Sequence, residues 1–159
     1  MNDHASSYIL DNYLKDLEDF VNSLNVENPI IIGHSLGGVI AISYAAKHQN
    51  VKMLIIEDIG TVVNSSNDFL NKFPVEFNSI YEVNKTFVEN LGRPLSTYFI
   101  ESLYYDKTHW KFRFDYQDMI QSQKEINSSY WEEWEKVNCP VLLIKGGKSW
   151  ASKEDNMKE

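Results

Sequence analysis

The residues with the clearest chemical potential form one short run, Gly33-His34-Ser35-Leu36-Gly37-Gly38, which matches the pattern G-x-S-x-G. In a turn this tight, the residues two before and two after the serine nearly touch. We therefore expect both Gly33 and Gly37 to be required because they lack a side chain. The same turn strains the serine backbone and exposes its hydroxyl. The pattern predicts a nucleophile at Ser35, with the backbone N–H of Leu36 stabilising the negative charge that develops during attack.

A serine hydroxyl is a weak nucleophile and needs a base, normally a histidine that a carboxylate orients. The chain has four histidines. His34 lies inside the turn itself, and we expect His4 and His48 to be exposed at a terminus and at a helix end. His109 lies in an aromatic stretch and is a minor candidate that could face a pocket.

The turn is flanked by the elements that would have to position the serine. Apolar residues recur at three- and four-residue steps between about residues 8 and 24, which predicts an amphipathic helix. Three isoleucines at 30–32 predict a strand buried on both faces, the alanine-rich stretch 39–48 a helix, and residues 51–56 a second strand. A strand, a helix and a strand in this order form a βαβ unit, which implies a parallel sheet.

The pattern changes after the second predicted strand. Residues 60–138 are polar and aromatic, with apolar groups in clusters of helical spacing. Three such clusters predict helices, at 95–105, 116–126 and 130–137. Residues 140–144, Pro-Val-Leu-Leu-Ile, return to the pattern of a buried strand, and Ser152 with the acidic residues after it predicts the start of one more helix.

The order and spacing of these motifs resemble the α/β-hydrolase superfamily, in its serine esterase and lipase-like branch with a helical cap between strands six and seven. The resemblance rests on the serine turn and on Cys-Pro-Val-Leu-Leu-Ile-Lys-Gly at 139–146, and it covers nearly the whole chain. It implies an α/β fold, with a partial α/β-hydrolase sheet equivalent to strands five to seven and an inserted helical cap. The implied division is a core with the nucleophile elbow at 1–59, the cap at 60–138 and a return to the core at 139–159.

The family's first four strands and its histidine-bearing segment have no counterpart in this sequence. The resemblance therefore implies that the catalytic histidine is not in this chain. It also implies the middle portion of a longer family member. A partial sheet of this kind is expected to have an uncovered face and unpaired edges.

The resemblance leaves two places for the acid that orients the histidine. Relatives usually place it after strand seven, where this chain has Trp150 at the position that often holds Asp. Other relatives place it after strand six, where Glu57 and Asp58 stand. Because adjacent strands lie about 5 Å apart and sites form beyond their carboxyl ends, Asp58 could reach a histidine that also reaches Ser35. We favour Asp58 as the acid, with Glu57 as the runner-up; the competing explanation is that Asp58 only hydrogen-bonds within its own turn.

The resemblance also implies a substrate class. It indicates a hydrolase that acts on carboxylic esters or related acyl substrates through Ser35, so the expected partner is a small-molecule ester or acyl compound. A serine nucleophile argues against the haloalkane dehalogenase and epoxide hydrolase chemistry of relatives with a carboxylate nucleophile. Acyltransferases and C–C hydrolases of the same fold stay open. A catalytically inactive fragment or pseudoenzyme is the alternative.

Composition limits the other partners. The net charge of −8 disfavours binding to nucleic acid or anionic membrane surfaces, and there is no apolar run of roughly 18 residues that would predict a membrane span. The metal-binding residue types show no ligand spacing, so we expect no metal and no other cofactor. Cys139 is the only cysteine, and the N-terminus has no signal-peptide pattern, so we expect a cytoplasmic protein.

Overall fold

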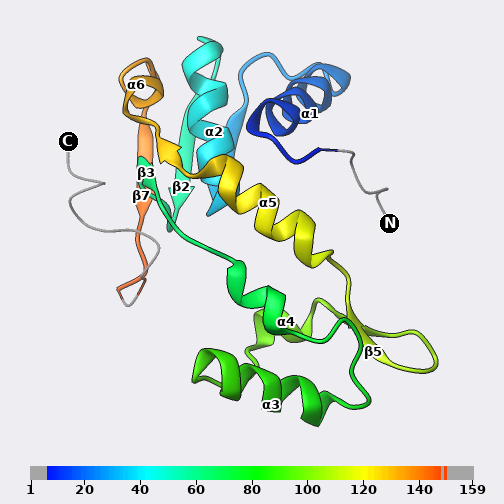
Figure 1. Ribbon diagram of the computed structural model, residues 1–159. Helices are drawn as coiled ribbons and strands as arrows, with labels where there is room; N and C mark the ends of the chain where they lie inside the picture. Colours follow the sequence, from blue (N-terminus) through cyan, green and yellow to red (C-terminus); the bar gives the residue numbers. More distant parts are fainter. Residues whose placement is uncertain (1–6, 148, 150–159) are drawn as a thin grey trace. The chain divides into compact units, whose positions relative to one another are not determined.

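The computed structural model describes residues 7–147 and 149 of the chain. These residues form two compact units (Figure 1). Residues 7–65, 125–147 and 149 belong to the first, called here the sheet unit, and residues 66–124 form the second, the insert unit. The sequence-based limits of the inserted segment, 60 and 138, lie further out on both sides, because short strands next to these limits pair within the sheet unit. That the inserted segment is a cap stays a prediction.

Three parallel strands form the sheet of the sheet unit: β1 (Ile30–His34), β2 (Met53–Glu57) and β7 (Val141–Ile144). β2 lies in the middle, so that Ile31 pairs with Leu54 and Leu54 pairs with Val141. Leucine and β-branched residues dominate these strands, as is usual for parallel strands that are covered by helices. The predicted parallel βαβ arrangement and the α/β fold class are confirmed.

Helices cover one face of this sheet (Figure 1). α2 (Leu36–Lys47) packs on β1 and β2, and both α1 (Leu10–Ser23) and α6 (Trp131–Trp134) pack against α2. Glu18 of α1 lies 2.9 Å from Nε2 of His48, the residue that follows α2, which links the two helices. Beneath them, Leu54 and Ile56 of β2 are completely buried.

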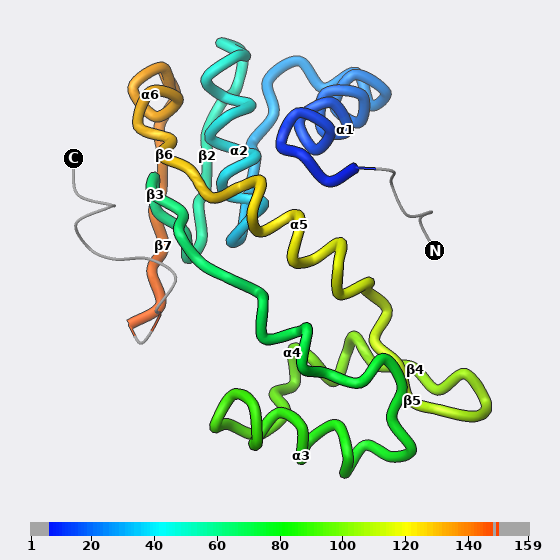
Figure 2. Tube along the Cα trace, in the orientation of Figure 1, coloured from blue at the N-terminus to red at the C-terminus, as the bar shows by residue number. Residues whose placement is uncertain are grey.

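The two ends of the inserted segment lie side by side in the sheet unit. β3 (Val62–Val63) pairs antiparallel with β6 (Ser128–Ser129), as Figure 2 shows. The Asn127 side chain accepts from the Ser65 N–H at 3.1 Å and donates to the Ser65 carbonyl at 2.8 Å. These bonds fix the points at which the chain leaves and re-enters this unit.

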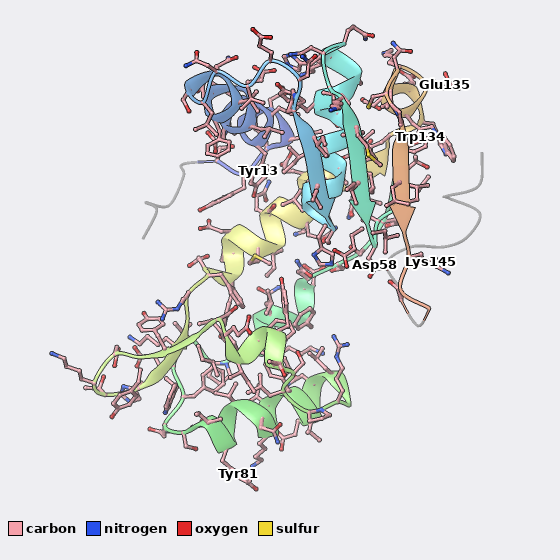
Figure 3. The ribbon with its side chains drawn as sticks, turned by 180° about the vertical axis from the view of Figure 1, so that it is seen from behind. Tyr13, Asp58, Tyr81, Trp134, Glu135 and Lys145 are labelled. Atoms are coloured by element: carbon pink, nitrogen blue, oxygen red, sulfur yellow. The ribbon has the colours of Figure 1, made fainter. Side chains whose placement is uncertain are left out.

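The opposite face of the sheet is apolar and exposed. Ile30 and Ile32 of β1 are 53% and 69% exposed, and Leu142 and Ile144 of β7 are 45% and 43% exposed. Figure 3 shows this face toward the viewer, with α2 behind the strands. The expectation that residues 30–32 form a strand buried on both faces is therefore wrong, because the described helices of the sheet unit lie on the other face (Figures 1 and 3).

The insert unit has a core of its own, built from aromatic and aliphatic side chains. Phe77 and Phe87 are almost fully buried, and the rings of Phe73 and Phe87 meet edge to face with their centroids 5.1 Å apart. Its elements are η1 (Asp68–Lys72), α3 (Ile80–Leu91), α4 (Thr97–Ile100), β4 (Leu103–Tyr105), β5 (Trp110–Phe112) and most of α5 (Tyr116–Ile126). The predicted helix at 116–126 has the bounds of α5.

The predicted helix at 95–105 is wrong. α4 covers only one turn of it, and β4 then pairs antiparallel with β5. The turn between these strands determines the outcome, because Oδ1 of Asp106 accepts from the N–H groups of Thr108 and His109, both at 2.9 Å. This side-chain bonding favours a turn over a continuing helix.

One buried hydroxyl in α2 leads to a stability prediction. Ser43 is 2% exposed, and its Oγ has no hydrogen-bond partner among the described residues. Ser43→Ala removes an unsatisfied polar atom and introduces a better helix former, so we expect the free energy of unfolding to rise by about 1 kcal/mol. Urea unfolding measures the change.

The contrast for this prediction is Thr86 in α3. Thr86 is buried too, but its hydroxyl donates to the Glu82 carbonyl at 3.0 Å. Thr86→Val keeps the shape and removes a satisfied bond, so its free energy of unfolding should fall by about 1 kcal/mol. A fall of the same size in Ser43→Ala would mean that the Ser43 hydroxyl is satisfied, against the prediction.

Candidate active site

Ser35 stands between β1 and α2 in a conformation that few non-glycine residues adopt. Its φ of 51° and ψ of −121° lie outside the allowed regions for most L-residues, so the backbone is strained there. Its N–H donates to the Glu57 carbonyl at 3.0 Å, and its own carbonyl accepts from the Gly38 N–H at 2.8 Å. These two bonds hold the turn against the end of β2. The side chain of Ser35 is half-buried and makes no capping hydrogen bond to α2.

Two glycines have no room for a side chain: Gly33 inside the turn, and Gly38 against Ile59. A Cβ on Gly33 would lie 2.2 Å from the carbonyl oxygen of Gly37, and a Cβ on Gly38 would lie 2.4 Å from a methyl carbon of Ile59. A Cβ on Gly37 would meet none of the described atoms within 4 Å. The expectation that Gly37 must lack a side chain is therefore wrong, because the described atoms leave space for a Cβ there. Gly37 takes part in the close contact through its backbone, and Gly33 is the residue that must lack a side chain. The sequence did not predict the requirement at Gly38, whose missing side chain lets α2 pack against Ile59.

The N-terminus of α2 lies directly after the serine. Leu36 is the first residue of the helix, so its N–H belongs to the first turn, where N–H groups have no acceptor within the helix. The partial positive charge of this helix end favours an anion beside Ser35. The N–H of Ser35 itself is bonded to Glu57, so Leu36 is the next donor along the chain.

Asp58 follows β2 directly and also has a left-handed backbone, with φ of 56°. Its N–H donates to the Ile144 carbonyl at 2.8 Å, which fixes it at the carboxyl end of the sheet. Its carboxylate accepts twice from the segment after β7: Oδ1 from the Gly146 N–H at 3.3 Å, and Oδ2 from the Ser149 hydroxyl at 2.7 Å. Figure 3 shows Asp58 and Lys145 at the same end of the sheet. The competing explanation, a bond confined to its own turn, does not describe these contacts.

Glu57 lies in a different position from Asp58. It is the last residue of β2, in register with His34 and Ile144, and its side chain is exposed. Side chains alternate along a strand, so Glu57 lies on the same open face as Ile55. The geometry thus separates the two carboxylates that the sequence left as alternatives.

The described histidines have partners or positions of their own. His34 is exposed on β1, and His48 lies against Glu18 and stacks on Tyr44 with ring centroids 4.1 Å apart. In the insert unit, Nδ1 of His109 lies 3.6 Å from Glu76. No hydrogen bond joins any of these three rings to Ser35 within residues 7–147. His4, Trp150 and the predicted helix start at Ser152 lie outside the described residues.

His109 lies beside a cluster of charged side chains. Nζ of Lys111 lies 2.6 Å from Glu76 and 2.8 Å from Asp106. The Lys111 ammonium lowers the pKa of both carboxyls below their usual values, and both carboxyls raise the pKa of Lys111. These groups are partly exposed, so their ion pairs are expected to add little to stability.

The described part of the chain contains no group of three or more His, Cys, Asp or Glu residues that could hold a metal ion. None of its helices is long and apolar enough to cross a membrane.

Two partners of Asp58 were also not predicted from the sequence. Gly146 and Ser149 bind the Asp58 carboxylate, but they stand far from it in the sequence. The only signal in the sequence was their position just after the predicted strand at 140–144. In a parallel sheet, the end of that strand was expected to lie near the end of β2.

Comparison with known proteins identifies the family. Residues 2–159 match the family described as alpha/beta hydrolase fold. A curated relative, the 3-hydroxybutyrate-oligomer hydrolase of Cupriavidus necator, is 22% identical over 170 aligned residues, which cover 91% of this chain and 57% of the relative.

Solved structures show the same fold at low sequence identity. An E-2-(acetamidomethylene)succinate hydrolase superposes with a TM-score of 0.79 at 17% identity, covering 98% of this chain and 62% of that one. A marine microorganism esterase superposes with a TM-score of 0.71 at 20% identity, covering 97% and 65%. The chain thus spans less than two thirds of the length of all three proteins. Since the family match extends over nearly all of its residues, the chain belongs to the α/β-hydrolase fold family.

Proposed function

We propose that this chain carries the nucleophile and the acid of a serine hydrolase that cleaves carboxylic esters or related acyl substrates. The observation that carries the proposal is the strained backbone of Ser35 at the start of α2, with Gly33 packed against the backbone of Gly37. Strain of this kind persists where the surrounding structure over-determines it, and it is common at active sites.

In the proposed reaction, the Ser35 hydroxyl oxygen attacks the carbonyl carbon of the ester while a histidine takes the hydroxyl proton. The Leu36 N–H and the N-terminus of α2 stabilise the oxyanion of the tetrahedral intermediate. The intermediate expels the alcohol, which receives the proton from the histidine, and leaves an acyl group on Ser35. Water then attacks the acyl group with the same histidine as base and frees the carboxylic acid.

Asp58 is the proposed acid of this site. Its place beyond the end of β2, next to the strand that leads into Ser35, supports this role over that of Glu57 on the open face. The histidine is proposed to come from outside residues 7–147 and 149, because the described histidines are engaged elsewhere or lie on the open face.

The ester class is supported by the relatives. One similar structure is named an esterase, and the curated relative is named for hydrolysis of 3-hydroxybutyrate oligomers. A small-molecule acyl substrate is therefore proposed, and the single Cys139 favours a reducing compartment such as the cytoplasm. Acyltransferases with a serine nucleophile differ in the acceptor of the acyl group. C–C hydrolases with a serine nucleophile differ in the leaving group, which is a carbon.

A fluorophosphonate probe tests the nucleophile. We expect the whole protein to be labelled on one residue, and the label to disappear in Ser35→Ala while Ser43→Ala retains it. The labelled peptide, identified by mass spectrometry, should contain residue 35.

The same experiment addresses the alternative, a catalytically inactive chain. Labelling that persists in Ser35→Ala would place the nucleophile elsewhere. Absence of labelling in a protein that unfolds cooperatively in urea would favour the inactive chain and contradict the proposed function. The isolated 159-residue chain is expected to label weakly or not at all, because the catalytic histidine is proposed to lie outside this chain.

A further inference from the structure

We propose that Ser149 is a positioning residue of the active site: its hydroxyl, together with the Gly146 N–H, holds the Asp58 carboxylate in the orientation that a histidine requires. The inference rests on the proposed function, because it concerns the acid of that same site.

The contacts come from the segment that follows β7, residues 145–147 and 149, called here the β7 loop. Oγ of Ser149 lies 2.7 Å from Oδ2 of Asp58, a short distance that fits a hydroxyl donating to a carboxylate. The Gly146 N–H donates to Oδ1 at 3.3 Å. One donor on each oxygen fixes the plane of the carboxylate, which a single donor would leave free to rotate.

The β7 loop is itself held in place. The Ser149 N–H donates to the Gly146 carbonyl at 2.9 Å, which links the two donor residues directly. The Asp58 N–H donates to Ile144, the last residue of β7. Three hydrogen bonds therefore connect Asp58 to β7 and its loop, although these residues are separated in sequence by the whole insert unit.

This arrangement suits a carboxylate that orients a histidine. Gly146 donates to one oxygen of Asp58 and Ser149 donates to the other, and a carboxylate oxygen can accept more than one hydrogen bond. Residues that hold a reacting group from behind in this way are expected at an active site.

The expected effect of Ser149→Ala is a loss of turnover at unchanged substrate binding. A hydrogen bond to a charged group is worth about 1.5–3 kcal/mol, so we expect kcat to fall about tenfold to a hundredfold with KM within twofold. Ser149→Thr keeps the hydroxyl and should recover most of the rate. Lys145→Ala changes the exposed neighbour in the same loop and should leave kcat unchanged.

A double-mutant cycle separates positioning from a general structural role. If Ser149 acts through Asp58, then Ser149→Ala should cost little in the Asp58→Asn background, where the carboxylate is already lost. The measurements are hydrolysis of p-nitrophenyl butyrate and the rate of fluorophosphonate labelling, both on the whole protein, with urea unfolding as the check on folding.

The outcomes distinguish the inference from the function on which it rests. An undiminished rate in Ser149→Ala, with Ser35→Ala inactive and Asp58→Asn impaired, overturns the positioning role and leaves the serine hydrolase intact. Equal losses from Ser149→Ala in the wild-type and Asp58→Asn backgrounds overturn it too. If the wild-type protein neither hydrolyses the ester nor labels at Ser35, the proposed function fails and the role of Ser149 fails with it.

Discussion

Asp58→Asn is expected to lower kcat by about 10⁴-fold and to leave the fold intact. Asparagine has the size of aspartate and tolerates a left-handed backbone, so the φ of 56° at this position should be retained without strain. The substitution removes the negative charge and converts one acceptor oxygen into a donor amide. A histidine facing this group would lose its orienting acceptor and the charge that stabilises the imidazolium, so the Ser35 proton would have no competent base.

The measurement is kcat for an activated ester in the whole protein, with thermal unfolding of the same samples. Glu57→Gln tests the runner-up directly: the Glu57 side chain lies on the open face, so its loss should change kcat by less than about threefold. A loss of less than about threefold in Asp58→Asn, combined with a large loss in Glu57→Gln, would transfer the role of the acid to Glu57.

The serine turn was predictable because its determinants are local. The glycines, the strand before them and the helix after them lie within one short stretch, and the steric rule that relates them does not depend on distant residues. The same holds for the parallel pairing of β1 and β2, since a crossover helix between two apolar runs leaves few other topologies.

The rest depended on contacts between distant parts of the chain. The periodicity of the aromatic residues in the segment of β4 and β5 suits either a helix or a strand. The turn at Asp106 decides for the hairpin of β4 and β5, where a helix had been predicted. The partners of Asp58 could not be predicted either, because only the folded sheet brings the β7 loop next to the end of β2.

The prediction that β1 is buried on both faces was wrong for a different reason. An unbroken run of isoleucines indicates a strand that is apolar on both sides, but it does not indicate which elements cover each side. Ile31 faces the helices, whereas Ile30 and Ile32 lie on the open face. A helix start was also missed: Ser79 accepts from the Glu82 N–H at 3.2 Å at the beginning of α3, and this S-x-x-E signature was present in the sequence.

Gly33→Ala is expected to destabilise the protein by at least about 3 kcal/mol. The added Cβ would lie 2.2 Å from the carbonyl oxygen and 2.5 Å from the carbonyl carbon of Gly37, and 2.7 Å from the Gly38 nitrogen. All three atoms are backbone, so no side-chain rotation can relieve the overlap and the turn itself must open. Opening the turn would also move Ser35 away from its bond to Glu57, so labelling by a fluorophosphonate should be lost along with stability.

Gly37→Ala is the matched test, because it makes the same chemical change on the other side of the serine. A Cβ there would meet no described atom within 4 Å, and alanine is the better helix former by about 1 kcal/mol, so stability should be equal or slightly higher. Urea unfolding of the two variants against the wild type measures both effects. Equal destabilisation by both substitutions would restore the symmetric requirement expected from the sequence, whereas a difference of several kcal/mol would assign the steric constraint of the turn to Gly33 alone.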